Sequence, residues 1–205
     1  PADCGPACIS LSQDVQGELF NYPEEFFKER IHAIRRPRAD DYQIKQAVEI
    51  IKKAKNPIII SGGGVFYSDA MKELSAFAKK HNIPTTQTVM GYSTMKRDDP
   101  YFLGPIGGLG GKAANNLAKK TDLAIAVGTK LGDFTTGSWA NFENPKFKLI
   151  SINVARFDAN KHMAQSVIGD AKVSLLDISN TLGSWKAPND WYKKSRTELE
   201  SWNNY

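Results

Sequence analysis

Residues 128–139, GTKLGDFTTGSW, form the segment of this sequence best suited to contact a ligand. They are rich in Gly, Thr and Asp, and they follow an apolar run, LAIAV, at residues 123–127. An apolar run that ends at a glycine is typical of a strand buried on both faces of a parallel sheet. Ligands of open α/β sheets bind beyond the carboxyl ends of such strands, so residues 130–139 are the first candidates for function. A surface loop that needs glycine for its turns is the alternative interpretation.

A second glycine turn, Gly62-Gly63-Gly64, follows the apolar run at residues 57–60. Dinucleotide binding requires G-x-G-x-x-G between a strand and a helix, with an acidic residue about 20 positions later. Tyr67 stands where the third glycine belongs, and residues 82–88 contain no acid. A structural turn is therefore favoured over a phosphate site, although glycines still allow a close backbone approach.

A phosphate-binding P-loop at residues 104–113 is excluded by the sequence. The pattern G-x-x-x-x-G-K-[ST] ending at Lys112 needs glycine at 106 and a hydroxyl residue at 113, and the chain has Ile106 and Ala113.

The sequence contains no complete catalytic or metal-binding set. His32, His81 and His162 are isolated from one another, and no nucleophile motif of the G-x-S-x-G type occurs. Cys4 and Cys8 lack the partners that a metal site or a disulfide framework requires. We expect no catalytic residue and no metal ligand in this chain, and two reduced, partly buried thiols.

Hydrophobic periodicity predicts alternating strands and helices. The predicted strands are residues 7–11, 57–60, 83–89, 123–127, 147–153 and 166–170. The predicted helices are residues 43–54 after an Asp40 or Asp41 cap, a segment from a Ser68 or Asp69 cap to residue 81, and residues 112–120, 173–182 and 193–202. Residues 91–111 are expected to be a long Gly-rich connection, and Asp158 is expected in a loop. This alternation predicts an α/β fold: a parallel sheet of five or six strands with helices on both faces.

Composition excludes several classes of function. Hydrophobic residues make up 41% and charged residues 24% of the 205 positions, as in ordinary globular proteins. The net charge of +5 comes from a basic stretch at residues 28–38 and from lysine pairs at predicted helix ends, without the interleaved aromatics of single-strand binders. We therefore expect no nucleic-acid partner. We also expect no membrane partner and a cytoplasmic location, because no apolar run is long enough to span a bilayer and no signal-peptide pattern occurs.

Five phrases resemble the central domain of thiamine-diphosphate-dependent enzymes, the group of acetohydroxyacid synthase and pyruvate oxidase. They are PEEFF at 23–27, RRP at 35–37, SGGGV at 61–65, DFTTGSW at 133–139 and INVARFDANKH at 152–162. The resemblance implies four parts. Residues 1–27 end a preceding pyrimidine-binding domain, 28–41 are a linker, 42–184 are the central α/β domain, and 185–205 lead towards a diphosphate-binding domain.

Within that group, the phrases are similar to hydrolases that open the ring of a polyol-derived cyclic 1,2-dione in myo-inositol breakdown. The resemblance implies thiamine diphosphate and magnesium in the full-length enzyme, flanking domains of the same subunit as partners, and a homo-oligomer. The family's catalytic Glu has no counterpart here. Its G-D-G motif is absent, because Phe134 follows Gly132-Asp133 and Ala171 follows Gly169-Asp170. We therefore expect the chain to be an excised fragment that is inactive alone. The alternatives are a related synthase or decarboxylase with an FAD site, or a stand-alone nucleotide-binding module.

The resemblance also assigns candidate site residues. Relatives that bind FAD use positions that correspond here to Gly62, Gly63, Gly64, Gly128, Thr129, Asp133 and Asp158. FAD is not expected for the hydrolase. In that enzyme the segment 133–139 is expected to line the substrate path, with donors from Thr135, Thr136 and Ser138.

Overall fold

The computed structural model describes residues 7–31, 33 and 35–204, in two compact units that divide between Arg35 and Arg36. The first unit contains a helical turn α1 (Gln13–Gln16) and a 3-10 turn η1 (Glu24–Phe27), neither with a buried residue. Its aromatic rings contact one another: the ring centroids of Tyr22 and Phe26 are 4.9 Å apart.

Two expectations about the first unit are wrong. Residues 7–11 form no strand, because no other described segment pairs with their backbone. Cys8 is free, as predicted, but it is exposed rather than partly buried, since this unit has no core to cover it. Cys4 lies outside the described residues.

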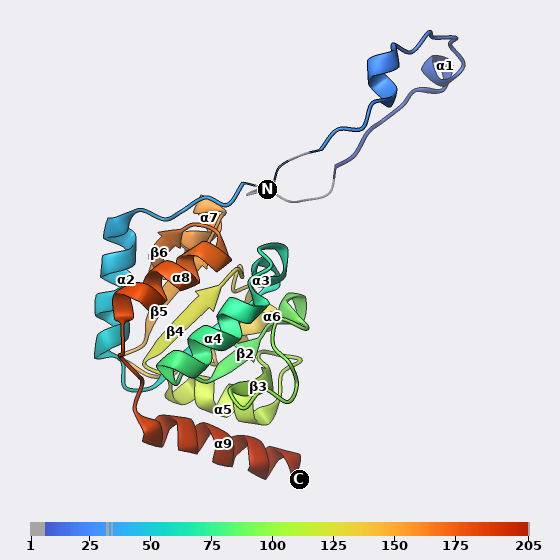
Figure 1. Ribbon diagram of the computed structural model, residues 1–205. Helices are drawn as coiled ribbons and strands as arrows, with labels where there is room; N and C mark the ends of the chain where they lie inside the picture. Colours follow the sequence, from blue (N-terminus) through green and yellow to red (C-terminus); the bar gives the residue numbers. More distant parts are fainter. Residues whose placement is uncertain (1–6, 32, 34, 205) are drawn as a thin grey trace. The chain divides into compact units, whose positions relative to one another are not determined.

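The second unit is built on a six-stranded, wholly parallel sheet, which confirms the predicted fold class (Figure 1). Its strands are β1 (Pro57–Ser61), β2 (Thr85–Gln87), β3 (Phe102–Pro105), β4 (Leu123–Val127), β5 (Lys148–Asn153) and β6 (Gln165–Ile168). They lie in the order β3-β2-β1-β4-β5-β6. The chain therefore winds outward in both directions from the central pair, where Pro57 is in register with Leu123. Such a reversal of strand order is the switch point at which open α/β sheets bind ligands.

Two helical layers cover the sheet. On one face lie α2 (Asp41–Lys53), α4 (Met71–His81) and α8 (Ala171–Leu182), and on the other α5 (Lys112–Lys120) and α9 (Asn189–Asn203). β4 supplies large side chains to the first face, such as Ile125, and alanines to the second, such as Ala124 and Ala126. Both layers are apolar, so every residue of β4 is buried, as its continuous apolar run predicted.

Trp191 fixes α9 to the second face. Its side chain is buried, and the indole Nε1–H donates a hydrogen bond of 2.7 Å to the carbonyl oxygen of Pro57, at the start of β1. Lys120 and Glu198 join α5 to α9 through an ion pair of 2.7 Å. The predicted helix at 193–202 is therefore confirmed, and it packs against the central sheet.

One predicted helix cap is confirmed and one is wrong. Asp40 caps α2 by accepting from the N–H of Gln43 at 2.8 Å. Asp170 caps α8 through the N–H groups of Lys172 and Val173. The predicted cap of α4 is wrong: the helix begins after Ala70, which provides no side-chain cap.

The structure also contains a short strand and short helices where connections were predicted. β3 lies within residues 91–111, which were expected to contain no strand. Four-residue helices, α6 (Asp133–Thr136) and α7 (Arg156–Ala159), replace loops expected after β4 and β5. The glycine turn after β1 continues directly into α3 (Gly63–Tyr67). Each of these segments is too short to reveal its period in the sequence.

Candidate functional site at the carboxyl edge of the sheet

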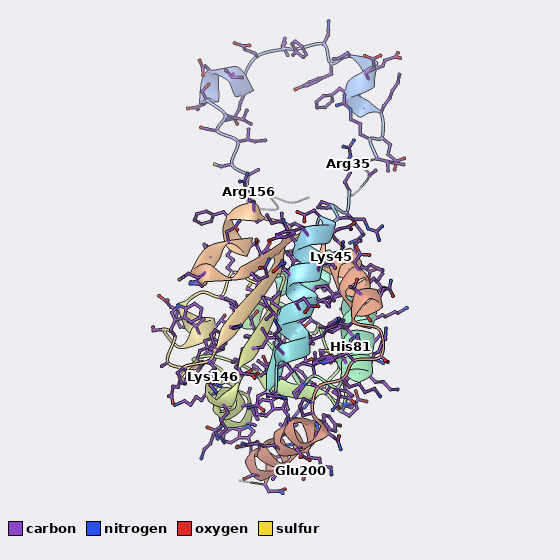
Figure 2. The ribbon with its side chains drawn as sticks, turned by 90° about the vertical axis from the view of Figure 1, so that its left-hand side faces the viewer. Arg35, Lys45, His81, Lys146, Arg156 and Glu200 are labelled. Carbon is purple, nitrogen blue, oxygen red and sulfur yellow. The ribbon has the colours of Figure 1, made fainter. Side chains whose placement is uncertain are left out.

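The candidate residues gather at the edge of the sheet where the parallel strands end. Figure 2 shows the direction of β5: Lys146, just before the strand, lies in the lower part of the second unit, and Arg156, just after it, lies at the upper end. The segments that follow β1, β4 and β5 therefore all start from one edge, and they contain every residue proposed for the site.

The two glycine turns at the switch point pack directly on each other. The N–H of Gly62 donates to the carbonyl of Val127 at 2.8 Å, and the N–H of Gly64 donates to the carbonyl of Gly128 at 2.9 Å. A Cβ on Gly62 would lie 2.5 Å from the Cβ of Thr129. Real Cβ atoms do not approach other atoms so closely, so this packing requires glycine.

This contact bears directly on nucleotide binding. A pyrophosphate at a strand-to-helix turn is held by free N–H groups of the turn and of the helix N-terminus. Here the N–H groups of Gly62 and Gly64 are bonded to β4 and its turn, and the N–H of Val65 is bonded to the carbonyl of Gly62. Three N–H groups that a pyrophosphate could use are therefore already bonded to protein backbone, which argues against a dinucleotide at this turn.

Thr129 and the two aspartates have different surroundings. The Thr129 hydroxyl accepts from the N–H of Leu131 at 3.3 Å, and its carbonyl accepts from the Asn153 amide at 3.4 Å. Asp133 is exposed at the first turn of α6. Asp158, on α7, forms an ion pair of 2.6 Å with Lys161 rather than with a residue of the glycine turns.

The segment 133–139 is a helical turn closed by its own side chains. Thr136 is fully buried, and its hydroxyl accepts from the N–H of Trp139 at 3.2 Å. Thr135 is half-buried and Ser138 is exposed. Of the three hydroxyls assigned to the substrate path, those of Thr135 and Ser138 are therefore the accessible ones.

Asn115 and Asn141 contact the candidate segment or its neighbours, and the sequence did not single them out. The Asn115 carboxamide on α5 accepts from the N–H of Gly107 at 2.9 Å and donates to the carbonyl of Gly107 at 3.0 Å. Its oxygen also accepts from the Asn141 amide at 3.3 Å. The available signal was an Asn in the middle of an otherwise favourable helix, where Asn is a poor helix former.

Strained backbone is concentrated in the segments after β4 and β5. Left-handed, non-glycine residues there are Leu131, Ser138, Trp139, His162 and Met163. The Trp139 and His162 rings, with centroids 4.4 Å apart, join the two segments. Such outliers persist only where surrounding contacts hold them, and they cluster at functional sites.

An open hollow of about 520 Å³ lies beside α7, lined by Arg156, Phe157, Asn160 and Lys161. The Lys161 ammonium lies 4.6 Å from the centre of the Phe157 ring and also pairs with Asp158. Within residues 7–31, 33 and 35–204, no three His, Cys, Asp or Glu side chains are placed to share a metal ion. No helix in that same part of the chain is long and apolar enough to cross a bilayer.

Comparison with known proteins matches the central unit to one family. The model described as "Thiamine pyrophosphate enzyme, central domain" matches residues 44–178. This range runs from α2 to α8, and so includes all six strands and the whole carboxyl edge.

Individual relatives are similar over nearly the entire chain. The chain is 48% identical over 182 residues, 89% of its length, to a 3D-(3,5/4)-trihydroxycyclohexane-1,2-dione hydrolase of Clostridium perfringens (strain 13 / Type A). It is 45% identical over 203 residues, 98% of its length, to a protein of the same name from Clostridium tetani (strain Massachusetts / E88). The chain spans only 28% of the first relative and 32% of the second.

Proposed function

The chain belongs to the family of thiamine pyrophosphate enzyme central domains, and from this premise we propose that it serves a hydrolase that opens the ring of a trihydroxylated cyclohexane-1,2-dione. One observation carries the proposal: relatives that are 45–48% identical over 89–98% of the chain bear the name of that activity. Because the chain spans less than a third of these relatives, the activity is assigned to the full-length protein.

The reaction cleaves the bond between two adjacent carbonyl carbons. Water adds OH to one carbon, which becomes a carboxylic acid, and H to the other, which becomes an aldehyde. In a ring the two groups remain on one open chain. Thiamine diphosphate, when bound, supplies the electron sink that such carbanion chemistry needs. We assign its binding, and that of magnesium, to flanking domains, since neither Gly-Asp pair here continues as G-D-G.

In this proposal the chain has two tasks. Residues 42–184 form the packed middle layer between a pyrimidine-binding domain that ends at residue 27 and a diphosphate-binding domain beyond 205, with 28–41 and 185–205 as connections. The segment 133–139 lines the path of the substrate, and Thr135 and Ser138 offer hydroxyls to its polyol edge. The full-length enzyme is proposed to be a cytoplasmic homo-oligomer.

We further propose that Gly62, Gly64 and Gly128 serve close packing rather than cofactor binding. The N–H groups of Gly62 and Gly64 donate to the carbonyls of Val127 and Gly128, and a Cβ on any of the three glycines would lie less than 3 Å from backbone of the opposite turn. This packing supports the hydrolase over the alternative of a synthase or decarboxylase with FAD at this edge.

The test is an assay of the full-length protein that contains this chain, supplied with thiamine diphosphate and Mg²⁺. Ring opening of the cyclic dione is followed by acid release at constant pH and by the aldehyde proton in NMR. We expect one equivalent of acid per dione consumed, and none from the 205-residue chain alone. Carbon dioxide release from a 2-keto acid, without dione cleavage, would instead establish the synthase or decarboxylase alternative.

A further inference from the structure

One side chain on α5 holds the segment that follows β3. Asn115 contacts both backbone polar groups of Gly107: its Oδ1 accepts from the N–H at 2.9 Å, and its Nδ2 donates to the carbonyl at 3.0 Å. This paired arrangement fixes the orientation of the Gly107 peptide as well as its position. Gly107 itself has φ +100°, a conformation that side-chain-bearing residues rarely adopt.

Gly107 in turn sets the position of the helical turn α6. A Cβ on Gly107 would lie 2.8 Å from the Cα of Thr135, so the two backbones are in direct contact. The next residue, Gly108, donates from its N–H to the carbonyl of Phe134 at 2.7 Å. The place of Phe134 and Thr135 therefore depends on a peptide that Asn115 holds.

The Asn115 carboxamide is also linked, through Asn141, to the carboxyl-terminal part of the segment 133–139. Asn141 donates from Nδ2 to the Asn115 oxygen at 3.3 Å, and its own backbone N–H bonds to the carbonyl of Thr136 at 3.2 Å. Asn141 is buried. The Asn115 oxygen thus accepts two hydrogen bonds and its amide donates one. The partners of these bonds, Gly107 and Asn141, lie on either side of the segment 133–139.

We propose that Asn115 is a positioning residue that orients the segment 133–139 toward the substrate. The inference rests on the proposed function, because it gives that segment the substrate path. Asn115 does not touch the substrate in this scheme. It acts through Gly107 and Asn141, and it keeps the Thr135 and Ser138 hydroxyls where the hydroxyls of a cyclic polyol can meet them.

The test is the variant Asn115→Ala in the full-length enzyme, with thiamine diphosphate and Mg²⁺ bound. Loss of three hydrogen bonds releases both ends of the segment, and the hydroxyl contacts made in ground state and transition state weaken together. We expect KM for the dione to rise about tenfold while kcat changes less than about twofold. Asn116→Ala is the matched control: its amide donates to Glu198 at 3.3 Å on the α9 side, and we expect an unchanged KM.

A second variant keeps the proposal testable if Asn115→Ala does not fold. Asn141→Ala removes one weaker bond and leaves the Gly107 pair intact, so we expect a smaller rise in KM. Where Asn115→Ala does fold, adding Asn141→Ala to it should raise KM almost no further, because the two residues share that bond.

The outcomes separate the two levels of inference. A wild-type protein without dione cleavage contradicts the proposed function. An active wild type, with Asn115→Ala and Asn141→Ala both at the wild-type KM, contradicts the positioning role. So does a loss of kcat at constant KM, which is the signature of a smaller folded fraction. The melting temperature of each variant shows whether the protein is folded at the temperature of the assay.

Discussion

The N–H of Gly64 donates to the carbonyl oxygen of Gly128 at 2.9 Å, across the switch point of the sheet. A Cβ on Gly64 would lie 2.6 Å from the Cα of Gly128, so Gly64→Ala must push the two turns apart. We expect a loss of about 1–3 kcal/mol of unfolding free energy, as for other overpacked sites. Urea unfolding measures it.

Gly132→Ala is the matched control for this change. Nothing lies within 4 Å of a Cβ at Gly132, and its φ is −69°. We expect this variant to be neutral, or more stable by up to about 1 kcal/mol, because alanine restricts the unfolded chain. Equal destabilisation by the two substitutions would show that the Gly64–Gly128 contact is not tight.

Ligand addition tests whether backbone really closes the nucleotide position. A ligand at about 100 times its dissociation constant adds roughly 2.7 kcal/mol and moves the melting midpoint by several degrees. We expect no shift of the 205-residue chain with FAD, NAD, or thiamine diphosphate plus Mg²⁺. An FAD shift that Gly64→Ala abolishes would return Gly62, Gly64 and Gly128 to the role of cofactor ligands.

His81 makes the stability of the second unit depend on pH. The ring is buried between α4 and α8, where Nδ1 lies 2.8 Å from the carbonyl of Trp185 and Nε2 lies 2.9 Å from the Ser179 hydroxyl. Burial lowers the pKa of His81 from 6.5, and Lys80 and Lys186 lower it further, although the bond to Trp185 opposes them. The folded chain therefore keeps the ring neutral at a pH where the unfolded chain binds a proton.

The sign of the effect follows from that difference. The stabilisation is complete above pH 6.5 and is lost as the pH falls from there toward the lowered folded pKa. Between pH 7.5 and 5.5 we expect the unfolding free energy to fall by at most about 1.4 kcal/mol on account of this group. Unfolding of His81→Gln at both pH values gives the comparison, since its pH dependence should be smaller by that amount. Parallel behaviour of the two proteins would rule out His81 as the titrating group.

Asp170 joins a helix cap to an ion pair. It caps α8, and its second oxygen lies 3.0 Å from Nη1 of Arg36, with only 6% of the Asp170 side chain exposed. Asp170→Ala removes the cap and leaves the Arg36 guanidinium without its carboxylate. We expect a cost of about 2–4 kcal/mol in urea unfolding.

The exposed pair of Arg38 and Asp177, also 3.0 Å apart, is the control for Asp170. The Arg38 side chain is 68% exposed, so solvent screens the attraction, and Asp177→Ala should cost less than about 1 kcal/mol. If both aspartate variants lose the same stability, the Asp170 cap contributes nothing beyond a surface charge.

The long buried strands could be predicted because their residues carry a local signal. β1, β4 and β5 are apolar runs that end at or near a turn, and each was located within one or two residues. β3 was missed because its sequence, FLGP, offers two buried apolar residues followed by Gly104 and Pro105, which normally mark turns. The strand forms because β2 provides a partner along one edge, and this is information that lies outside the segment.

The candidate site likewise has features that the sequence predicted and features that it did not. Both glycine turns were predicted to follow strands of a parallel sheet, but that they meet depends on β1 and β4 being neighbours, and this strand order was not predicted. That the N–H of Gly64 would donate to the carbonyl of Gly128 depends on a separation of 2.9 Å, which no sequence pattern encodes. The burial of Thr136 and the hold of Asn115 on Gly107 depend likewise on how α5 and α6 pack.

The pairing of Pro57 with Leu123 at the centre of the sheet also sets the order of events in folding. β1 cannot acquire its central neighbour until every residue up to Val127 has been synthesised and the intervening chain has been closed into a loop. During that interval β1 lacks its neighbour β4, and the layers that later bury Ile58, Ile59 and Ile60 lack α8 and α9, which follow β4 in the chain. Folds dominated by such distant contacts nucleate slowly. A nascent chain interrupted before β4 would thus expose apolar side chains of β1. We expect chaperone binding to be strongest for chains that end just before Leu123.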